Sequence, residues 1–361
     1  MRAALLRQVG KPLTIEEIEV AKPKAYEVLV RTAFTGLCHS DLHFMEGLYP
    51  APLPIILGHE SAGVVEQVGA EVTYVKPGDP VIGCLSVFCG TCGYCSTGHT
   101  NLCENTEVKL PPGAARRFTC RGEVVNQFAN LGGFAEQMLV HENALVKIDR
   151  EIPLDIGALV GCAVITGVAS VFRAAKVEPG STVAVLGCGG IGLSAINAAA
   201  VAGASRVIAI DPVPAKLEVA RSMGATDTID ALRNDVVDAV KTLTGGGVHY
   251  AFEAVGRKET AEQSFQMLRP AGLATIIGMV PFGTKIELHG ADFLRDRRIQ
   301  GTSMGGNNFR VDMPRILALW RQGKLKLDHL IVRHIALDDI NDGYARMKTG
   351  NELRSIIRFA G

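Results

Sequence analysis

The sequence predicts an α/β protein of two domains, a small and mostly antiparallel β domain and a doubly wound parallel-sheet domain. Three observations support this: a length of 361 residues, a change from short β runs to alternating strand and helix patterns, and a glycine motif where that alternation begins. Apolar residues make up 47% of the chain, which is enough for two cores. Because 37 basic side chains balance 37 acidic ones, no net field attracts nucleic acid or an anionic membrane.

The first part of the chain consists of short β runs interrupted by glycine and proline. Between residues 28 and 83 these include EVLVRTAF, SAGVVEQVGAEV and GDPVIG. Such a pattern is typical of an irregular, mostly antiparallel domain.

The pattern changes at residue 179. From there strand-like and helical segments alternate, in the order TVAVLG, a helix to residue 202, RVIAID, a helix to residue 223, DTID, HYAFEAVG and ATIIG. Strands alternating with helices predict a parallel sheet with right-handed crossovers. After residue 299 the pattern is mixed again, with an amphipathic segment at 314–320. We therefore expect a nucleotide-type domain at 164–299 inserted between two parts of a first domain, 1–163 and 300–361.

Two apolar stretches, 156–172 and 179–205, resemble membrane spans by hydropathy. The second contains six glycines and is better explained as strand, turn and helix. The first ten residues contain only a four-residue apolar run before Arg7, which is too short for a signal peptide. We expect a cytoplasmic protein that neither crosses nor binds a membrane.

Four of the nine cysteines fall within fifteen residues. They are Cys89, Cys92, Cys95 and Cys103, in the spacing C-x2-C-x2-C-x7-C. Four thiolates at such spacing close a tetrahedral zinc shell and leave no position for substrate, so the site would be structural. An iron–sulfur cluster is the alternative, but in the ferredoxin run the fourth cysteine follows after three residues and precedes proline.

A dinucleotide motif follows the strand TVAVL. It reads Gly187-Cys188-Gly189-Gly190-Ile191-Gly192, matching G-x-G-x-x-G, and an alanine-rich helix comes next. The glycines permit a tight turn, approach of a pyrophosphate to the backbone, and close packing of helix on strand. The helix N-terminus favours phosphate. Asp211 ends the next strand, where it would bind the ribose hydroxyls and repel a 2′-phosphate, so we expect NAD rather than NADP.

Three further segments carry candidate metal ligands. They are GLCHSDLH with Cys38 and His43, GHES with His59 and Glu60, and GC with Cys162. Together with the four-cysteine segment, GCAVITG, GCGGIG, AFEAVG and the terminal LRSII, they resemble the zinc-dependent alcohol dehydrogenases of the medium-chain dehydrogenase/reductase superfamily over essentially the whole length.

The resemblance implies a GroES-like catalytic domain, with its zinc lobe at 84–104, and a Rossmann cofactor domain. It implies two zinc ions per chain, the catalytic one bound by Cys38, His59 and Cys162 with a fourth position open. Asp41 would orient His59, and Glu60 would be either an alternative ligand or a partner of the ligands. Zinc would acidify a bound alcohol, and hydride would pass to NAD.

The remaining roles are also implied by the resemblance. Ser40 would take the alcohol proton and His43 would be the terminal base of the relay. The residues expected to contact the cofactor outside the glycine motif and Asp211 are His39, Thr166, Lys216, Gly278 and Arg354. The residues expected to line the substrate pocket are Tyr49, Leu85, Phe134 and Met279.

The apolar pocket suggests a medium-chain or aromatic primary alcohol and its aldehyde. Glutathione-dependent formaldehyde dehydrogenases carry an acid and an arginine at the positions of Tyr49 and Glu107, and neither is present here. An S-(hydroxymethyl)glutathione substrate remains the alternative. Segment 104–131 resembles the longer loop of dimeric relatives, so a homodimer is expected over a tetramer.

Two other classes compete with this interpretation. A zinc-independent quinone reductase of the same superfamily would not need the cysteine and histidine ligands that this chain keeps. A zinc module for nucleic acid would need a Lys/Arg cluster around residues 89–103, and the sequence has none there.

Overall fold

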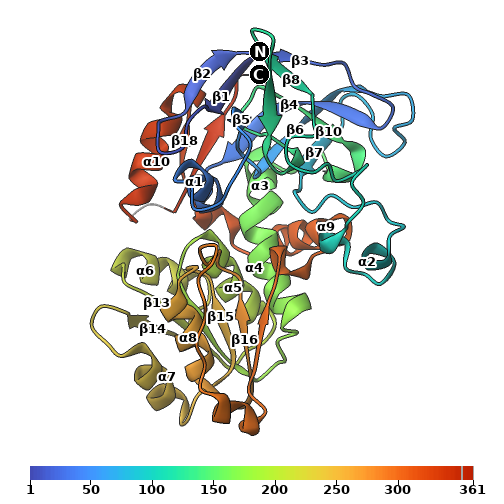
Figure 1. Cartoon of the computed structure of the whole chain (residues 1–361). Helices are drawn as coiled ribbons and strands as arrows, with labels where there is room; N and C mark the ends of the chain where they lie inside the picture. Colours follow the sequence, from blue (N-terminus) through green and yellow to red (C-terminus); the bar gives the residue numbers. More distant parts are fainter. Residues whose placement is uncertain (351–352, 361) are drawn as a thin grey trace. The chain divides into compact units, whose positions relative to one another are not determined.

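The computed structural model describes residues 1–350 and 353–360 (Figure 1). By contacts the chain divides into two compact units. Unit 1 contains Met1–Ala163, Asn308–Leu317 and Ile331–Gly361, and unit 2 contains Val164–Asn307 and Ala318–Leu330. The segment after residue 299, which we expected to belong to the first domain, is thus shared between the two units.

Unit 1 is built mainly from antiparallel strands in two sheets. The sheet orders are β2-β1-β5-β9-β8-β3 and β11-β7-β6-β4-β19-β18, with β10 also paired to β4. The strands are β1 (Arg2–Leu6), β2 (Thr14–Glu17), β3 (Glu19–Val20), β4 (Glu27–Gly36), β5 (Ile55–Ile56), β6 (Ser61–Val68), β7 (Pro80–Gly83), β8 (Phe118–Cys120), β9 (Glu123–Gln127), β10 (Gln137–His141), β11 (Leu145–Lys147), β18 (Ile331–Ile335) and β19 (Arg354–Arg358). The helices are α1 (His39–Met45), α2 (Gly93–Ser96), α3 (Leu154–Leu159) and α10 (Ile340–Lys348), and α9 (Phe309–Arg321) begins in this unit.

One strand pairing matters most for the site. β4 pairs with β19, so that Gly36 lies opposite Ile356. The pairing brings the C-terminal strand beside the end of β4, directly before Cys38, although more than 300 residues separate them along the chain.

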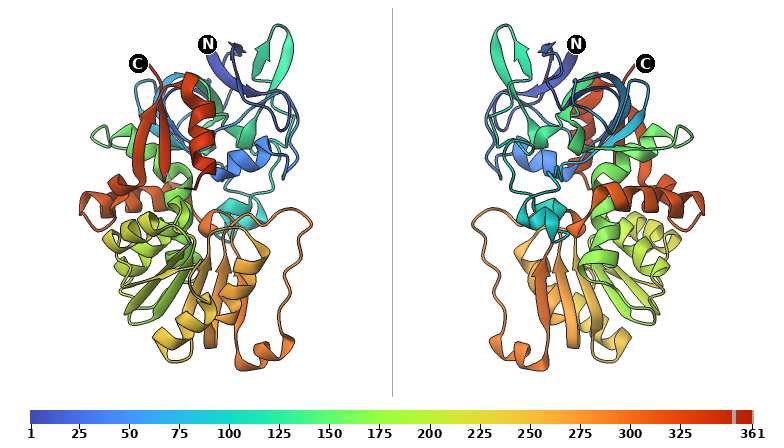
Figure 2. Two further views of the ribbon diagram at one scale, coloured as in Figure 1. Left: turned by 90° about the vertical axis from the view of Figure 1, so that its left-hand side faces the viewer. Right: turned by 90° about the vertical axis from the view of Figure 1, so that its right-hand side faces the viewer.

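Unit 2 contains a six-stranded sheet, in the order β14-β13-β12-β15-β16-β17, whose strands are all parallel. This confirms the predicted doubly wound sheet. The elements are α4 (Ile165–Ala169), β12 (Thr182–Leu186), α5 (Gly190–Val201), β13 (Arg206–Asp211), α6 (Pro214–Ser222), β14 (Asp227–Asp230), α7 (Val236–Thr244), β15 (Val248–Glu253), α8 (Lys258–Gln266), β16 (Leu268–Ile276) and β17 (Arg298–Gly301). Figure 2 shows the chain between β16 and β17 as a long excursion beside the sheet, carrying the short helix η6 (Gly290–Arg295).

The strand order reverses between β12 and β15. β12 pairs with β13 on one side and with β15 on the other. The interior strand β12 is buried from Val183 to Leu186, as expected for a parallel strand that helices cover on both faces. In such sheets the carboxyl ends at the reversal form a binding crevice.

The apolar stretch predicted at 156–172 lies in a helical run, Leu154–Ala174. Among the described residues this run alone is long and apolar enough to cross a membrane, and 89% of its most apolar window is buried inside the protein. It is therefore a core helix. One π-helical turn, Val160–Val164, interrupts it, and a second, Ser170–Ala174, ends it. The stretch predicted at 179–205 forms β12, the glycine turn and α5, as expected.

Candidate active site and cofactor site

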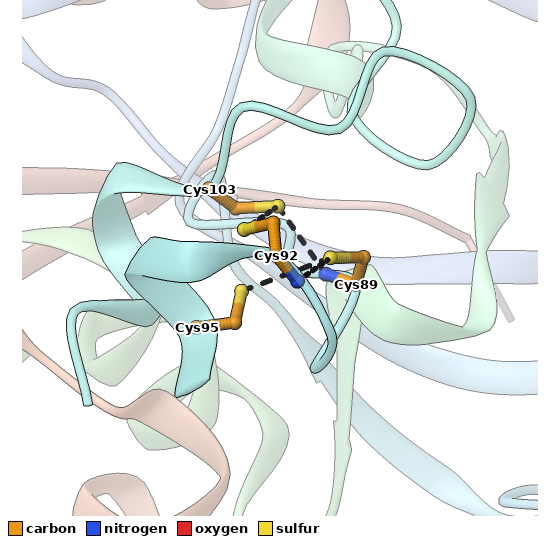
Figure 3. A group of neighbouring side chains, drawn as sticks. All are labelled: Cys89, Cys92, Cys95 and Cys103. Carbon is orange, nitrogen blue, oxygen red and sulfur yellow. Dashed lines mark hydrogen bonds between the residues drawn. The ribbon is translucent and has the colours of Figure 1, made fainter. Parts of the chain in front are cut away.

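The four clustered cysteines converge on one point in the loop that follows β7 (Figure 3). Their sulfur atoms all lie within 4.8 Å of one another, and the Cys89–Cys95 and Cys92–Cys103 sulfur pairs are each 3.9 Å apart. Thiolates bound to one zinc at about 2.3 Å would be about 3.8 Å apart, so the cluster fits that ion.

Backbone amides support these sulfur atoms. The N–H of Cys92 donates to the sulfur of Cys89 over 3.2 Å, and the N–H of Cys89 donates to that of Cys103 over 3.3 Å. The hydroxyl and N–H of Thr91, with the N–H of Cys92, lower the pKa of Cys89 to about 6, which favours the thiolate that a metal needs. The remaining cysteines, Cys84, Cys120 and Cys188, are buried and outside both clusters, as predicted.

A second cluster joins three distant segments. Cys38 caps the N-terminus of α1, His59 lies between β5 and β6, and Cys162 lies in the first π turn. Their ligand atoms lie within 4.8 Å of one another, and Nε2 of His59 is 3.2 Å from the sulfur of Cys162. Each residue is at most 3% exposed. Two thiols and one imidazole are a known ligand set of catalytic zinc, so the donors fit that metal.

Asp41 orients the imidazole of this cluster. Its Oδ1 lies 3.1 Å from Nδ1 of His59 and also accepts a hydrogen bond from the N–H of Gly58. Burial disfavours the imidazolium, but the charges of Asp41 and Cys38 outweigh burial and raise the pKa of His59 well above its ordinary value. A metal bound at Nε2 would displace the proton from that nitrogen, and the proton on Nδ1 would stay between His59 and Asp41.

A buried arginine and a buried glutamate adjoin the cluster. Arg354 donates a hydrogen bond to the carbonyl of Leu37 over 2.6 Å, and its Nη2 lies 3.6 Å from both the Cys38 sulfur and Oε2 of Glu60. Burial raises the pKa of Glu60 to about 8 against the opposing charge of Arg354. The role predicted for Arg354 at the cofactor stays a prediction, and this contact with the ligand set was not foreseen.

The predicted proton relay lies on α1. The hydroxyl oxygen of Ser40 is 3.7 Å from the Cys38 sulfur. The ring of His43 stacks on that of Tyr49, with centroids 6.2 Å apart, and partial burial lowers the pKa of His43. His39, predicted at the cofactor, is an exposed residue at the start of the same helix. Their roles stay predictions.

Three aromatic rings in contact with one another lie beside the second cluster. The ring of Phe128 meets the ring of His59 edge-on, with centroids 5.5 Å apart. The centroid of Phe44 lies 4.6 Å from that of Phe128 and 5.8 Å from that of Tyr49. Sequence reasoning missed Phe128, because its segment carries no motif and was used only for its resemblance to the longer loop of dimeric relatives.

The four predicted pocket residues lie in different settings. Phe134 has no exposed surface and packs against Tyr344 in the core of unit 1. Phe134 is therefore a core residue, and Phe128 is the phenylalanine adjoining the ligand set. Leu85 is half-buried against another core cluster of unit 1, and Met279 is half-buried in unit 2.

The glycine motif of unit 2 forms the turn between β12 and α5. Gly187 has φ of 92°, and a Cβ on Gly192 would lie 1.7 Å from the carbonyl oxygen of Gly187. No side chain fits either position. A Cβ on Gly189 would meet nothing within 4 Å, so this face of the turn is open to a ligand. Gly190 and Ile191 begin α5.

Asp211 ends β13 and is held by two backbone amides. Its Oδ2 accepts from the N–H of Cys188 over 2.7 Å and its Oδ1 from the N–H of Val213 over 2.9 Å. The carboxylate is thereby fixed beside the glycine turn, which fits a dinucleotide whose ribose hydroxyls bind there.

The other predicted cofactor residues of unit 2 belong to other elements. Thr166 is buried and donates to the sulfur of Met304 over 3.2 Å. Lys216 lies half-buried in the first turn of α6, and Gly278 follows β16. Their contacts with a cofactor stay predictions.

Two family models match the chain. A zinc-binding dehydrogenase model matches residues 190–319, and an alcohol dehydrogenase GroES-like domain model matches residues 24–150. Each match falls mainly within one of the two parts predicted from the sequence.

Solved structures are similar over the whole length. An alcohol dehydrogenase zinc-binding domain protein from Burkholderia ambifaria is 36% identical, covering 100% of this chain and 99% of its own, with a TM-score of 0.95. Benzyl alcohol dehydrogenase from Acinetobacter calcoaceticus is 34% identical, covering 99% of both chains, with a TM-score of 0.93. A zinc-binding dehydrogenase from Sinorhizobium meliloti, bound to NADP, is 29% identical over 99% of both chains, with a TM-score of 0.83.

Proposed function

Because this chain belongs to the zinc-binding alcohol dehydrogenases of the medium-chain dehydrogenase/reductase superfamily, we propose that it interconverts a primary alcohol and its aldehyde with NAD. The observation that carries the proposal is the buried set of Cys38, His59 and Cys162, which offers three ligands where the other cluster offers four. Three protein ligands leave a coordination position for substrate.

Each residue of this set and its neighbours has a role in the proposed reaction. Cys38, His59 and Cys162 would hold zinc, which when bound acts as a Lewis acid and lowers the pKa of an alcohol. Ser40 would accept the alcohol proton, and His43 would pass it to solvent. Because burial lowers the pKa of His43, its neutral form prevails at pH 7 and can act as a base.

NAD is proposed over NADP because of Asp211. Its carboxylate is fixed by two amides beside the glycine turn, so a 2′-phosphate placed there would meet a negative charge. A related protein binds NADP, so this choice needs its own test. We expect Asp211→Gly to shift the ratio of kcat/KM for NAD over NADP by about tenfold or more towards NADP. An unchanged ratio would remove Asp211 from this role.

The substrate is proposed to be a medium-chain or aromatic alcohol. Phe128, Phe44 and Tyr49 place apolar surface next to the ligand set. Similarity to a benzyl alcohol dehydrogenase agrees with this class. Rates with benzyl alcohol, hexanol, ethanol and S-(hydroxymethyl)glutathione test it, and a clear preference for the last would overturn it.

Metal content separates the dehydrogenase from its rivals. We expect about two zinc ions per chain, against none for a zinc-independent reductase and about one for a module that uses the four-cysteine cluster alone. Mass spectrometry of the native protein gives this count directly.

We further propose a cytoplasmic homodimer. None of the nine cysteines forms a disulfide, and cysteines at metal-ligand spacing without disulfides are typical of proteins from a reducing compartment. Phe282 and Leu294 are 86% and 88% exposed on the excursion that precedes the edge strand β17, and a second copy would cover such apolar side chains. Light scattering of the purified protein tests the assembly, and a monomeric mass would refute it.

A further inference from the structure

The last residue of β15 is a fully buried glutamate. Glu253 has no exposed surface, and its Oε1 accepts three hydrogen bonds. The donors are the N–H groups of Val255 at 2.9 Å and Gly256 at 2.7 Å, and the hydroxyl of Thr260 at 2.7 Å. One carboxylate oxygen therefore fixes the turn after β15 and the first residues of α8.

The same residue contacts the turn that follows β16. The carbonyl oxygen of Glu253 accepts hydrogen bonds from the N–H groups of Ile277 and Gly278. A Cβ on Gly278 would lie 2.6 Å from Oε2 of Glu253, and one on Gly256 would lie 2.7 Å from the carbonyl oxygen of Met279. The backbone of the turn after β15 thus packs closely on that of the turn after β16, and Glu253 contacts both turns.

The second carboxylate oxygen of Glu253 lowers the stability of the folded protein. Oε2 of Glu253 is buried and accepts no hydrogen bond from any residue that the structure describes. A buried polar atom left in this state opposes folding, so a residue chosen for stability alone would not be a glutamate here. The cost is understandable if the position of the two turns matters for binding.

The strand order indicates what these turns face. The order reverses between β12 and β15, and a dinucleotide lies across the carboxyl ends at such a reversal. Asp211, at the end of β13, marks the side of the adenosine ribose. The turns after β15 and β16 lie on the other side of the reversal and therefore face the second nucleotide half.

We propose that Glu253 is a positioning residue that holds the turns 254–256 and 277–280 in place for the nicotinamide half of the cofactor. The inference rests on the proposed use of NAD, and it adds a residue that belongs neither to the metal ligands nor to the glycine motif.

The test compares two ligands that share the adenosine half. NADH contains the nicotinamide and ADP-ribose lacks it, so loss of the glutamate should weaken the first and spare the second. For Glu253→Ala we expect the Kd for NADH to rise about tenfold or more and that for ADP-ribose to change less than twofold, measured by calorimetry. Exposed Glu259 on α8 provides the matched control, and Glu259→Ala should leave both values unchanged.

Hydrogen exchange of the protein without cofactor gives an independent readout. We expect faster exchange of the amides in 254–256 and 277–280 in Glu253→Ala, with the amides of α6 (Pro214–Ser222) unchanged. Should the alanine variant fail to fold, Glu253→Gln keeps the shape and weakens the acceptor, and a threefold rise in the NADH Kd is expected.

Two results would overturn the inference. One is equal weakening of NADH and ADP-ribose, which would mean general loosening of the unit, and the other is unchanged exchange in 277–280. If the wild-type protein bound no NADH, the proposed cofactor would be wrong, and the exchange data alone would decide whether Glu253 holds the two turns.

Discussion

The two cysteine-containing clusters differ in every property that decides what a metal could do there. The four-cysteine cluster comes from residues 89–103, has two ligands partly exposed, and is supported by backbone amides. The three-ligand cluster joins Cys38, His59 and Cys162, is buried, and is supported by a carboxylate. A closed local set stabilises a loop, whereas an open set assembled by the fold can take part in chemistry.

The largest expected effect comes from removing a ligand of the three-ligand cluster. Cys162→Ser should lower kcat/KM for alcohol oxidation about 10³-fold or more, because several kcal/mol of Lewis-acid stabilisation disappear. The zinc content should fall from about two to about one per chain, with little change in melting temperature. Cys84→Ser is the control, since Cys84 is equally buried but belongs to neither cluster. Full activity in Cys162→Ser would place the chemistry elsewhere.

The opposite pattern is expected for the four-cysteine cluster. Cys103→Ser should lower the melting temperature by about 5–10 °C, because zinc binding there contributes to folding. Turnover per remaining zinc should stay within about threefold of the wild type, since no substrate position is lost. Calorimetric scans with metal analysis measure both. Lost activity with unchanged melting would mean that the roles of the two clusters are exchanged.

The carboxylate support of the three-ligand cluster has its own test. Asp41→Asn should lower zinc affinity or activity about 10–100-fold, because the amide no longer fixes the His59 tautomer. Competition with a chromophoric chelator measures the affinity. Thr91→Ala removes one hydroxyl hydrogen bond to Cys89, while the backbone amides of Thr91 and Cys92 still donate to that sulfur, so it should have the smaller effect. Equal losses of zinc affinity in Asp41→Asn and Thr91→Ala would contradict the greater importance of the carboxylate for its cluster.

The effect expected at His43 depends on pH. Burial lowers its pKa from 6.5, so the base is available above that lowered value and is lost as the pH falls through it. His43→Gln should slow alcohol oxidation about tenfold near pH 7 and flatten the acid limb of the kcat/KM profile. Exposed His99 supplies the control, because His99→Gln should keep the wild-type profile. A wild-type profile in His43→Gln would exclude it from the relay.

The features predicted correctly from the sequence are those that depend on residues close together along the chain. Cys89 and Cys103 lie in one short segment, so their spacing indicated a common ion, and the alternation around Gly187 predicted the parallel sheet. Cys38 and His59 were found through the resemblance to a family, because neither has a local signature of its own.

What the sequence did not predict depends on long-range pairing. Arg354 reaches Cys38 only because β19 pairs with β4, and Phe128 reaches His59 through a segment without a motif. Phe134 was expected in the pocket, but an apolar side chain fits a core equally well and only the packing decides between them.

The π turn that contains Cys162 has a consequence for comparing relatives. Such a turn closes over one residue more than an α-helical turn. Deleting a single residue between Val160 and Val164 would barely alter the identity between two sequences, yet it would convert the π turn into an α-helical turn and change the direction of the side chains within it. A homologue with a one-residue gap at this place therefore could not be assumed to present its cysteine to the metal, however well the letters on either side align.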